Sequence, residues 1–386
     1  MKAVSAAFLS GPMYDPLYSH DSVISTAESL GLRMDFCGDH PALNRHLSTL
    51  TEIPYDLIST HTKYAPSQDH FLAPLDHLLS KDDLADFAPS ILEMVRVGGT
   101  LRGLPRNVDV RLLHYRTDLI PQPPGTWNEL FTIASSLVEP PELFGFVFSG
   151  RESGLFGTFY ELAEMGGAHL FPPSGIPQIN NEGGQWALQL LRTFVAEGVS
   201  PAEIPRLHYD QVHRYFLEGR AAMVGDWPGY FAAYCDASIS RVADRFAVCP
   251  YPTGPTGRSL AYGGSHTFAL THRGAANPAA VEMLRILTSV QSQLFEAHQG
   301  SVPVRHSIMK QMQASAQPRE LARWRALQDV IEHHMLIPPK LACYPHIEEV
   351  IWKTVQAAII GTVPISESLQ SITQKMKQIV EAQHGQ

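Results

Sequence analysis

A tryptophan in a loop is the residue of this chain best suited to contact with a small molecule. Trp227 follows the apolar run Ala221–Val224 and is flanked by Asp226 and by a Pro-Gly pair. Proline and glycine favour an irregular loop, so the indole and its neighbouring carboxylate are expected to lie open. A flat ring beside hydrogen-bonding groups suits a ligand with apolar faces and polar edges. The alternative is that Trp227 anchors the fold.

Two adjacent glycines mark a second candidate loop. Gly263 and Gly264 carry no side chain, so their backbone N–H groups can come close to a ligand. Tyr262 and Ser265 flank them and add a ring and a hydroxyl. The alternative is a hairpin turn without a role in binding.

Polar side chains also occur where strands are expected to end. Thr60 and His61 follow the short apolar run Tyr55–Ser59. Ligand sites of parallel sheets lie beyond the C-terminal ends of the strands. Asn107 and Asp109 belong to another polar block. These four side chains are therefore candidate ligand contacts.

Basic side chains could instead converge on an anion. The candidates are His61, Arg106, Arg111 and Arg305. Guanidinium groups match carboxylate, sulfate or phosphate, so an anionic ligand stays an alternative, although surface ion pairs are the expected role of the arginines. Ser153, in a polar loop after a predicted strand, is a further candidate contact.

Catalytic motifs are missing from the sequence. There is no G-x-S-x-G, P-loop, H-E-x-x-H or G-x-G-x-x-G after a strand, so we do not expect an enzyme. Metal capture is a weaker alternative. The chain has 18 histidines, but His333 and His334 are neighbours, whose side chains point apart on a helix.

Charge and composition narrow the class of protein. With 29 Lys+Arg against 38 Asp+Glu in 386 residues, the net charge of −9 opposes nucleic-acid binding. A 44% hydrophobic content can bury a sizeable core, and the length favours two lobes. The four cysteines form no C-x-x-C pair. Buried free thiols are expected, with a Cys235–Cys249 disulfide as the alternative.

The first hundred residues alternate between strand and helix patterns, which predicts βαβ units and a parallel sheet. The start lacks the pattern of a signal peptide and is expected to be a strand that ends at Gly11-Pro12. No apolar run reaches the roughly 18 residues of a membrane span. Strands are predicted at Ala3–Leu9, Leu32–Cys37 and Tyr55–Ser59, and helices at Asp21–Leu30 and Ala42–Leu50.

Amphipathic helices dominate the rest of the chain. Thr126 and Glu129 have the spacing of a capping box before one of them. Apolar residues at helical spacing predict further helices at Glu182–Glu197, Pro278–Ala297, Glu320–His333 and Glu367–Ala382.

Seven segments, in order, resemble family 1 extracellular solute-binding proteins of bacterial ABC importers, in the carbohydrate-binding, maltose-binding-protein-like branch. They span roughly residues 50–306. The segments are Tyr55–Ile58 with Leu72–Asp76, Leu101–Pro105 with Leu113–Asp118, Pro124–Glu129, Gly166-Gly167 with Asn180-Asn181, Phe216–Val224, Pro250–Pro255 with Tyr262–Ser265, and Gly300–Pro303.

The resemblance implies an α/β, type II clamshell of two lobes joined by a hinge. Lobe 1 would comprise residues 1–113 and 267–306, and lobe 2 residues 114–266 and 307–386. The family often stacks the position of Trp227 on a sugar ring, lines the cleft with the loop around Gly263, and places Asp or Asn at the positions of Asn107 and Asp109. At Thr60 and His61 the chain departs from the carboxylate or polar group that the family commonly has there.

The resemblance also implies how such a protein would work. It would capture a small carbohydrate without chemistry or a cofactor, close its lobes and dock on a membrane permease with its ATPase. A monomer in the periplasm or at the cell envelope is expected. An anionic sugar derivative, or a metal, remains the alternative ligand.

Overall fold

The computed structural model describes residues 3–11, 13–172 and 175–384. They form two compact α/β units, and each unit is built from three segments that are not consecutive in the sequence. Unit 1 consists of Met1–Asp109, Gly263–Trp324 and Ile337–Ala342, and unit 2 of Val110–Tyr262, Arg325–Leu336 and Cys343–Gln386. Met1, Lys2, Pro12 and residues 385–386, which the predicted first strand or the predicted lobes include, lie outside the described residues. None of the described helices is long and apolar enough to cross a membrane.

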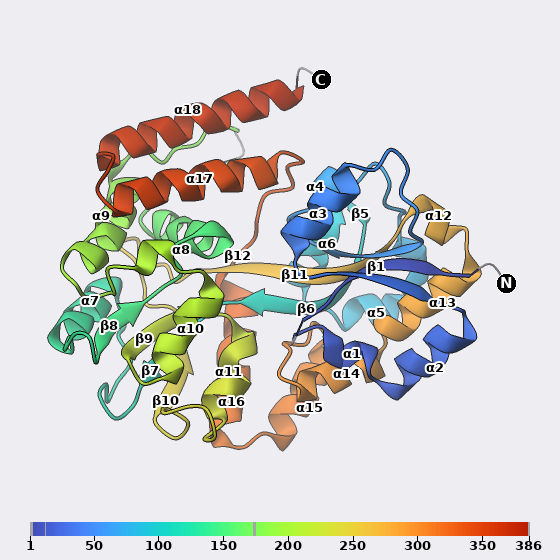
Figure 1. The fold of residues 1–386 in the computed structure, drawn as a ribbon, viewed down its shortest axis with the longest axis horizontal. Coiled ribbons are helices and arrows are strands. Elements are labelled where there is room, and N and C mark those ends of the chain that lie inside the picture. Colours follow the sequence, from blue (N-terminus) through green and yellow to red (C-terminus); the bar gives the residue numbers. More distant parts are fainter. Residues whose placement is uncertain (1–2, 12, 173–174, 385–386) are drawn as a thin grey trace. The chain divides into compact units, whose positions relative to one another are not determined.

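A mostly parallel sheet forms the centre of unit 1 (Figure 1). β1 (Ser5–Leu9) pairs in parallel with β2 (Arg33–Cys37) and β3 (Leu57–His61), and β11 (Ala261–Leu270) is antiparallel to β3. β6 (Leu104–Val110) pairs with β11. The predicted βαβ alternation is therefore confirmed, and the parallel strands β1 and β3 end at Leu9 and His61.

Alternating side chains of the buried strands feed two separate cores. Phe8 on β1 and Phe268 on β11 belong to one core, together with Leu284 from a helix. Leu9 and Ala269 belong to the other, together with helix residues around Leu43. Because neighbouring side chains of a strand point to opposite faces, both faces of this sheet must be covered by helices, as a parallel sheet requires.

Short helices and connecting strands complete unit 1. They are α1 (Asp15–Tyr18), α2 (Asp21–Ser29), α3 (His40–Ser48), α4 (Ala65–Gln68), η1 (Asp76–Leu78), α5 (Lys81–Ala85), α6 (Pro89–Val95), β4 (Arg96–Val97), β5 (Thr100–Leu101), α12 (His272–Ala275), α13 (Pro278–Leu287), α14 (Val290–His298), α15 (His306–Ser315) and α16 (Pro318–Asp329), whose last residues belong to unit 2.

The long helix predicted at Pro278–Ala297 was wrong as a single element. The chain leaves α13 at Thr288 and restarts as α14, because the side chain of Ser289 accepts a hydrogen bond from the N–H of Ser292 and caps a new helix. The apolar stripe continued across this break, so periodicity alone did not reveal it.

Unit 2 contains a four-stranded sheet in the order β10-β7-β9-β8. β7 (Leu112–Arg116) is antiparallel to both β10 (Phe246–Cys249) and β9 (Ala221–Asp226), whereas β8 (Phe144–Val147) is parallel to β9. The two-residue strand β12 (Met335–Leu336) pairs with Ala261-Tyr262 at the start of β11.

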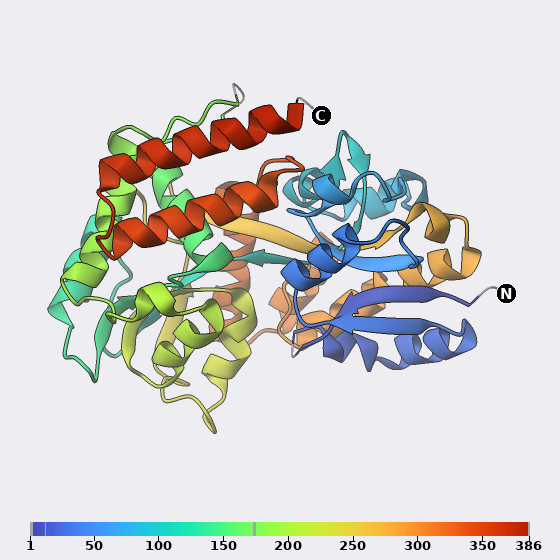
Figure 2. The ribbon, with the colours of Figure 1, turned by 45° about the horizontal axis from the view of Figure 1, so that its top comes forward.

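Helices of unit 2 pack on one another as well as on this sheet. α17 (Tyr344–Ile359) contacts α8 (Glu152–Met165), α9 (Glu182–Ala196) and α18 (Ile365–His384), and Figure 2 shows α17 and α18 side by side. The other elements are α7 (Trp127–Ser136), η2 (Ile204–Arg206), α10 (Tyr209–Leu217), η3 (Pro228–Tyr230), α11 (Phe231–Cys235) and the π-helical turn η4 (Val330–His334).

The N-terminal cap of α7 differs from the predicted capping box. The Thr126 hydroxyl accepts from the N–H of Glu129, as expected. The Glu129 carboxylate, however, accepts from the N–H of Gly125, one residue before the cap. The helix is capped, but its second hydrogen bond goes to the neighbouring donor.

The lobe boundaries expected near residues 114, 266 and 307 stay a prediction. The chain passes from one compact unit to the other between Asp109 and Val110 and between Tyr262 and Gly263, and the second segment of unit 1 runs to Trp324. Hydrogen bonds hold this segment within unit 1. The N–H of Ser307 donates to Asp86, and the guanidinium of Arg323 donates to the carbonyl of Gly300. How the units act as lobes stays a prediction.

All four cysteines are free, so the Cys235–Cys249 disulfide is not formed. Their predicted burial was wrong, because Cys235 is exposed and the others are partly exposed.

Candidate functional site

Unit 1 gathers most of its predicted binding residues around the ends of β3 and β6. The hydroxyl of Ser265 donates to the carbonyl of Asn107 at 2.7 Å, and the N–H of Ser265 donates to the hydroxyl of Thr62 at 3.2 Å. The side-chain oxygen of Asn107 is buried without a hydrogen-bond partner among the described residues. Leaving a buried acceptor unsatisfied costs free energy, so Asn107 is a plausible acceptor for a ligand hydroxyl.

Thr60 and Asp109 are engaged within unit 1. The hydroxyl of Thr60 donates to the side-chain oxygen of Gln68 at 2.5 Å. The carboxylate of Asp109 lies 2.5 Å from Nε2 of His266, a histidine that the sequence did not single out. Both predicted residues therefore orient neighbouring side chains.

The glycine pair does not form a turn. Gly263 and Gly264 lie inside the ten-residue strand β11, so the expected hairpin alternative was wrong. Gly264 makes room for an imidazole, since a Cβ there would lie 2.4 Å from Cε1 of His61. The N–H of Tyr262 is also occupied, because it donates to Glu161 at 2.6 Å. Gly264 thus permits close packing of His61, and the glycines do not form an exposed loop.

Arg106 forms an ion pair inside unit 1. Its guanidinium lies 2.6 Å from the Glu296 carboxylate and also donates to the carbonyl of Tyr14. Both side chains of the ion pair are at most 4% exposed. Rings of Tyr14, Tyr18 and Phe268 lie 5.2–5.5 Å from the guanidinium carbon. The ion pair expected at the surface is therefore buried, and Glu296 neutralises the charge.

The other two arginines also have carboxylate partners. Arg305 lies 3.6 Å from both Asp83 and Asp86. Arg111 of unit 2 lies 2.6 Å from Glu161 and donates to the hydroxyl of Thr158. Every guanidinium proposed to meet an anion is thus paired with an acid of its own unit.

Side chains of unit 2 contact the indole of Trp227. Trp227 follows β9, is partly exposed, and the guanidinium of Arg111 lies 5.4 Å from its ring centroid. The Tyr262 ring meets it edge-on at 6.3 Å. Tyr262 itself is buried and shares a 2.9 Å hydrogen bond with the hydroxyl of Tyr344. Buried neighbours therefore position an indole that is still partly accessible.

Asp226, by contrast, is buried. Its carboxylate accepts hydrogen bonds from the hydroxyl of Tyr234 and from the N–H of Trp227. Burial raises the pKa of Asp226 to about 7. The carboxylate of Asp226, which was expected to be accessible beside Trp227, is instead buried and hydrogen-bonded to the backbone of the loop that carries Trp227.

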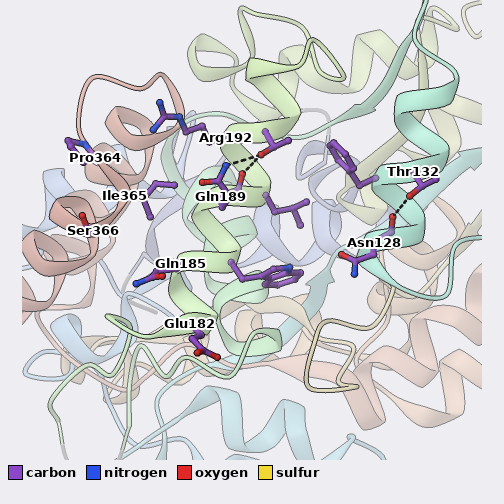
Figure 3. Close-up of a pocket in the computed structure, with 13 residues that line it drawn as sticks. Asn128, Thr132, Glu182, Gln185, Gln189, Arg192, Pro364, Ile365 and Ser366 are labelled. Atoms are coloured by element: carbon purple, nitrogen blue, oxygen red, sulfur yellow. Dashed lines mark hydrogen bonds between the residues drawn. The ribbon is translucent and has the colours of Figure 1, made fainter.

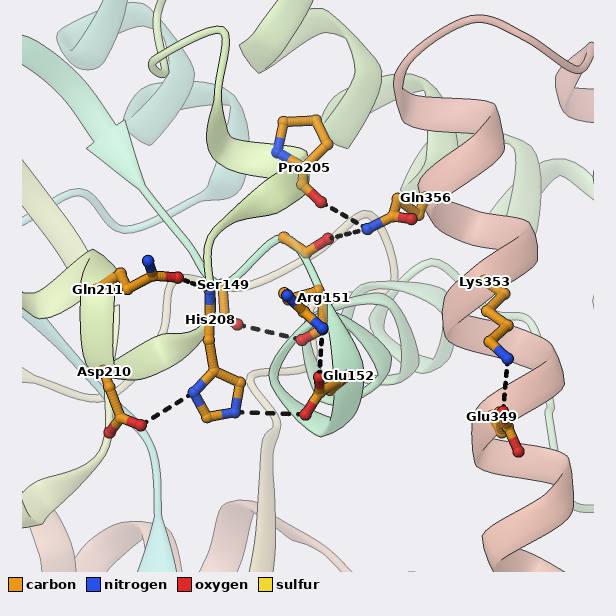
Figure 4. Close-up of polar contacts among 11 residues, drawn as sticks. Ser149, Arg151, Glu152, Pro205, His208, Asp210, Gln211, Glu349, Lys353 and Gln356 are labelled. Carbon is orange, nitrogen blue, oxygen red and sulfur yellow. Dashed lines mark hydrogen bonds and ion pairs between the residues drawn. The ribbon is translucent and has the colours of Figure 1, made fainter.

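A chain of polar contacts joins the loop of Ser153 to the loop of Trp227. Arg151 pairs with Glu152 at 2.7 Å, and His208 lies 3.6 Å from Glu152 and 3.0 Å from Asp210 (Figure 4). The hydroxyl of Tyr230 donates to the other oxygen of Asp210 at 2.5 Å. Ser153, in the first turn of α8, is partly exposed beside this chain.

A cavity of unit 2 lies apart from these residues. It has a volume of about 890 Å³ and is bordered by α7, α9 and the start of α18 (Figure 3). Trp186 and Arg192 line it, together with polar side chains such as Gln189, and it includes none of the predicted binding residues. Across the described parts of the chain, no group of three or more His, Cys, Asp or Glu side chains is arranged to hold a metal ion.

Comparison with known proteins identifies the family. A model of the family described as bacterial extracellular solute-binding protein matches residues 54–294, more than half of the chain. The chain therefore belongs to the bacterial extracellular solute-binding proteins, as the resemblance predicted.

Individual relatives are binding proteins. A probable ABC transporter-binding protein of Deinococcus radiodurans is 30% identical over 225 residues, which cover 55% of this chain and 53% of the relative. The chain thus spans about half the length of that protein. A mannitol-binding protein of Pseudomonas aeruginosa is 26% identical over 341 residues, covering 80% of this chain and 76% of the relative. The predicted absence of enzymatic function agrees with these relatives.

Solved structures establish the fold class. Maltose-bound MalE3 of T. maritima has a TM-score of 0.86 at 23% identity, covering 98% of this chain and 100% of that one. A solute-binding protein of Agrobacterium radiobacter K84 in complex with ribitol has a TM-score of 0.84 at 19% identity, covering 98% of both chains. The fold is the α/β, two-lobed type II binding-protein fold that was predicted.

Proposed function

We propose that this protein is the ligand-capturing component of an ABC importer and binds a small neutral polyhydroxy compound, a sugar or a sugar alcohol. It delivers this ligand to a membrane permease and its ATPase, and acts as a monomer in the periplasm or at the cell envelope. The names of the relatives support this ligand class, since they include a mannitol-binding protein and proteins solved with maltose and ribitol.

One observation carries the choice of a neutral ligand. Arg106, Arg111 and Arg305 each have a carboxylate partner in their own unit. Uncharged predicted residues keep capacity for a ligand, namely the unsatisfied oxygen of Asn107 and the partly exposed ring of Trp227. Amide oxygens and aromatic faces match the hydroxyls and the apolar faces of a polyol. An anionic sugar lacks this support.

Thermal melting against a panel of ligands tests the proposal. A ligand that binds only the folded protein must raise the melting temperature. We expect a neutral sugar or sugar alcohol to do so, and uronates, sulfonated sugars and divalent metals to leave it unchanged. A shift with an anionic ligand alone would contradict the neutral assignment, and no shift with any neutral compound would contradict the ligand class.

Variants of two tryptophans distinguish the binding region. Trp227→Ala is expected to weaken binding of the active compound by about 1–3 kcal/mol, the contribution of an aromatic contact with its buried area. Trp186→Ala, in the cavity between α7 and α9, is the matched control and should leave affinity unchanged. Loss of binding in the Trp186 variant, with Trp227→Ala unaffected, would move the ligand to that cavity.

A further inference from the structure

Three histidines from distant parts of the sequence meet in unit 1. His40 begins α3 after β2, His61 ends β3, and His266 lies in β11. Their ring centroids are 4.8–5.4 Å apart, and each residue is at most 9% exposed. His40 and His61 lie at or just beyond the C-terminal ends of the parallel strands β2 and β3, and ligands of α/β proteins bind beyond such strand ends. Only His61 was singled out from the sequence.

A hydrogen-bonded chain links two of these rings to a carboxylate. Nε2 of His266 lies 2.5 Å from Asp109, and Nδ1 of His266 lies 2.6 Å from Nε2 of His40. Because an ionised carboxylate only accepts, Nε2 of His266 must donate to it. A single proton then lies between Nδ1 of His266 and Nε2 of His40, because two protons there would place two donors opposite each other. The last hydrogen bond of the chain therefore runs from His266 to Asp109.

The backbone determines the tautomer of His61. The N–H of Lys63 donates to Nδ1 of His61 at 3.2 Å. A backbone N–H can only donate, so Nδ1 carries a lone pair and the proton of the neutral ring is on Nε2. No hydrogen bond from this Nε2–H to a described residue is found. An oxygen of a ligand could therefore accept a hydrogen bond from this Nε2–H.

Burial and the neighbouring basic side chains work against a second proton on His61. Burial lowers the pKa of His61 well below its ordinary value, and charge on His266 and His40 and on Lys63 and Lys340 lowers it further. Burial likewise lowers the pKa of His40, with His266, Lys63 and Arg106 contributing. The charged groups around the cluster also include Asp109, on His266, and Glu296, which neutralises Arg106. Rings of Tyr14 and Tyr64 complete the enclosure.

Protonation would also break the local geometry. A proton on Nδ1 of His61 would face the N–H of Lys63, so this hydrogen bond would be lost and the ring would have to move. Gly264 leaves little room for that movement, because the ring already occupies the space of a Cβ at this position.

We propose that burial against His40 and His266, together with the N–H of Lys63 at Nδ1, keeps His61 a neutral Nε2–H donor for an oxygen of the captured ligand, and so makes capture insensitive to acid. His40, His266 and Asp109 are positioning residues, and His61 is the contact. This inference rests on the proposed function, and it adds a tautomer, a direction of hydrogen bonding and a dependence on pH.

The histidine side chains can be observed without any ligand. We would record nitrogen and carbon NMR shifts of the imidazoles of the full chain between pH 5 and 8. His61 is expected to show the Nε2–H tautomer at every pH. In His266→Gln the ring that packs 5.2 Å from His61 and helps to bury it is gone, so His61 is expected to titrate within this range. His70→Gln, which replaces an exposed histidine of unit 1, is the matched control and should leave His61 unchanged. An Nδ1–H tautomer, or ordinary titration of His61 in the natural protein, would overturn the proposal.

Binding of D-mannitol and maltose by calorimetry gives the second readout. The affinity of the natural protein for whichever probe binds should be constant from pH 5.5 to 8. That of His266→Gln should fall at least fivefold between pH 8 and 5.5. A flat profile for His266→Gln, with its fold intact by circular dichroism, would refute the positioning role. If neither probe binds, these two ligands are excluded for the proposed function, and the NMR signature of His61 still decides the inference.

Discussion

Glu296→Gln tests whether Arg106 is a structural residue or a ligand group. The substitution keeps the shape of the side chain and an acceptor oxygen but removes the charge opposite a buried guanidinium. In the structure, Nε and a terminal nitrogen of Arg106 both reach the same Glu296 oxygen, at 2.7 and 2.6 Å. The remaining acceptor is the carbonyl of Tyr14 at 2.8 Å. A buried cation would therefore lose its counter-charge while staying buried.

The size of the effect follows from these contacts. Hydrogen bonds to charged groups contribute about 1.5–3 kcal/mol and neutral ones about 0.5–1.5 kcal/mol. Two hydrogen bonds to a neutral oxygen in place of a carboxylate thus cost about 2 kcal/mol. The uncompensated buried charge adds to this, and removal of one partner of a buried ion pair costs about 3–5 kcal/mol in all. We expect a loss of about 3–5 kcal/mol in the free energy of unfolding.

Urea denaturation followed by circular dichroism measures this loss. Glu349→Gln is the matched control, because Glu349 pairs with Lys353 at 2.5 Å on the exposed surface of α17 (Figure 4). Exposed pairs contribute at most about 1 kcal/mol, so this variant should remain close to the natural stability. A loss below about 1 kcal/mol for Glu296→Gln would refute the reasoning. Arg106 would then be available to a ligand, and the anionic alternative would regain its support.

Three further predictions concern unit 2. Relative to the natural chain, Asp226→Asn should gain stability as the pH rises from 4 to 8, by at most about 1.4 kcal/mol per pH unit. Urea denaturation of both proteins at several pH values measures this difference. The reason is that burial raises the pKa of Asp226 to about 7, so its protonated folded form stabilises below pH 4 and this stabilisation is lost as the pH rises through about 7; a pH-independent difference would contradict this. Gly145→Ala should lower the melting temperature strongly, because its Cβ would lie 2.1 Å from the carbonyl oxygen of Ala134, whereas an unchanged melting temperature would show that β8 and α7 separate easily. Thr126→Ala should cost about 1 kcal/mol through loss of the cap of α7, and Thr126→Ser, which keeps the hydroxyl, should restore most of it.

The sequence by itself determined the class of the protein and the type of most elements. Alternating strand and helix patterns before residue 60 predict a parallel sheet, and β1, β2 and β3 form it. These predictions succeed because they rest on local periodicity, which the chain carries in consecutive residues. The same local view misjudged Ser289, whose hydroxyl ends one amphipathic stripe as a cap and begins another helix.

Only the tertiary structure decided which polar residues remain available to a ligand. Arg106 and Glu296 are 190 residues apart, yet they neutralise each other. His40 and His266 are 226 residues apart and share one hydrogen bond. Pairing at such separations depends on which strands and helices become neighbours, and no local pattern encodes it. The tautomer of His61 has the same origin, because it follows from the position of one backbone N–H and from the burial that three packed elements create.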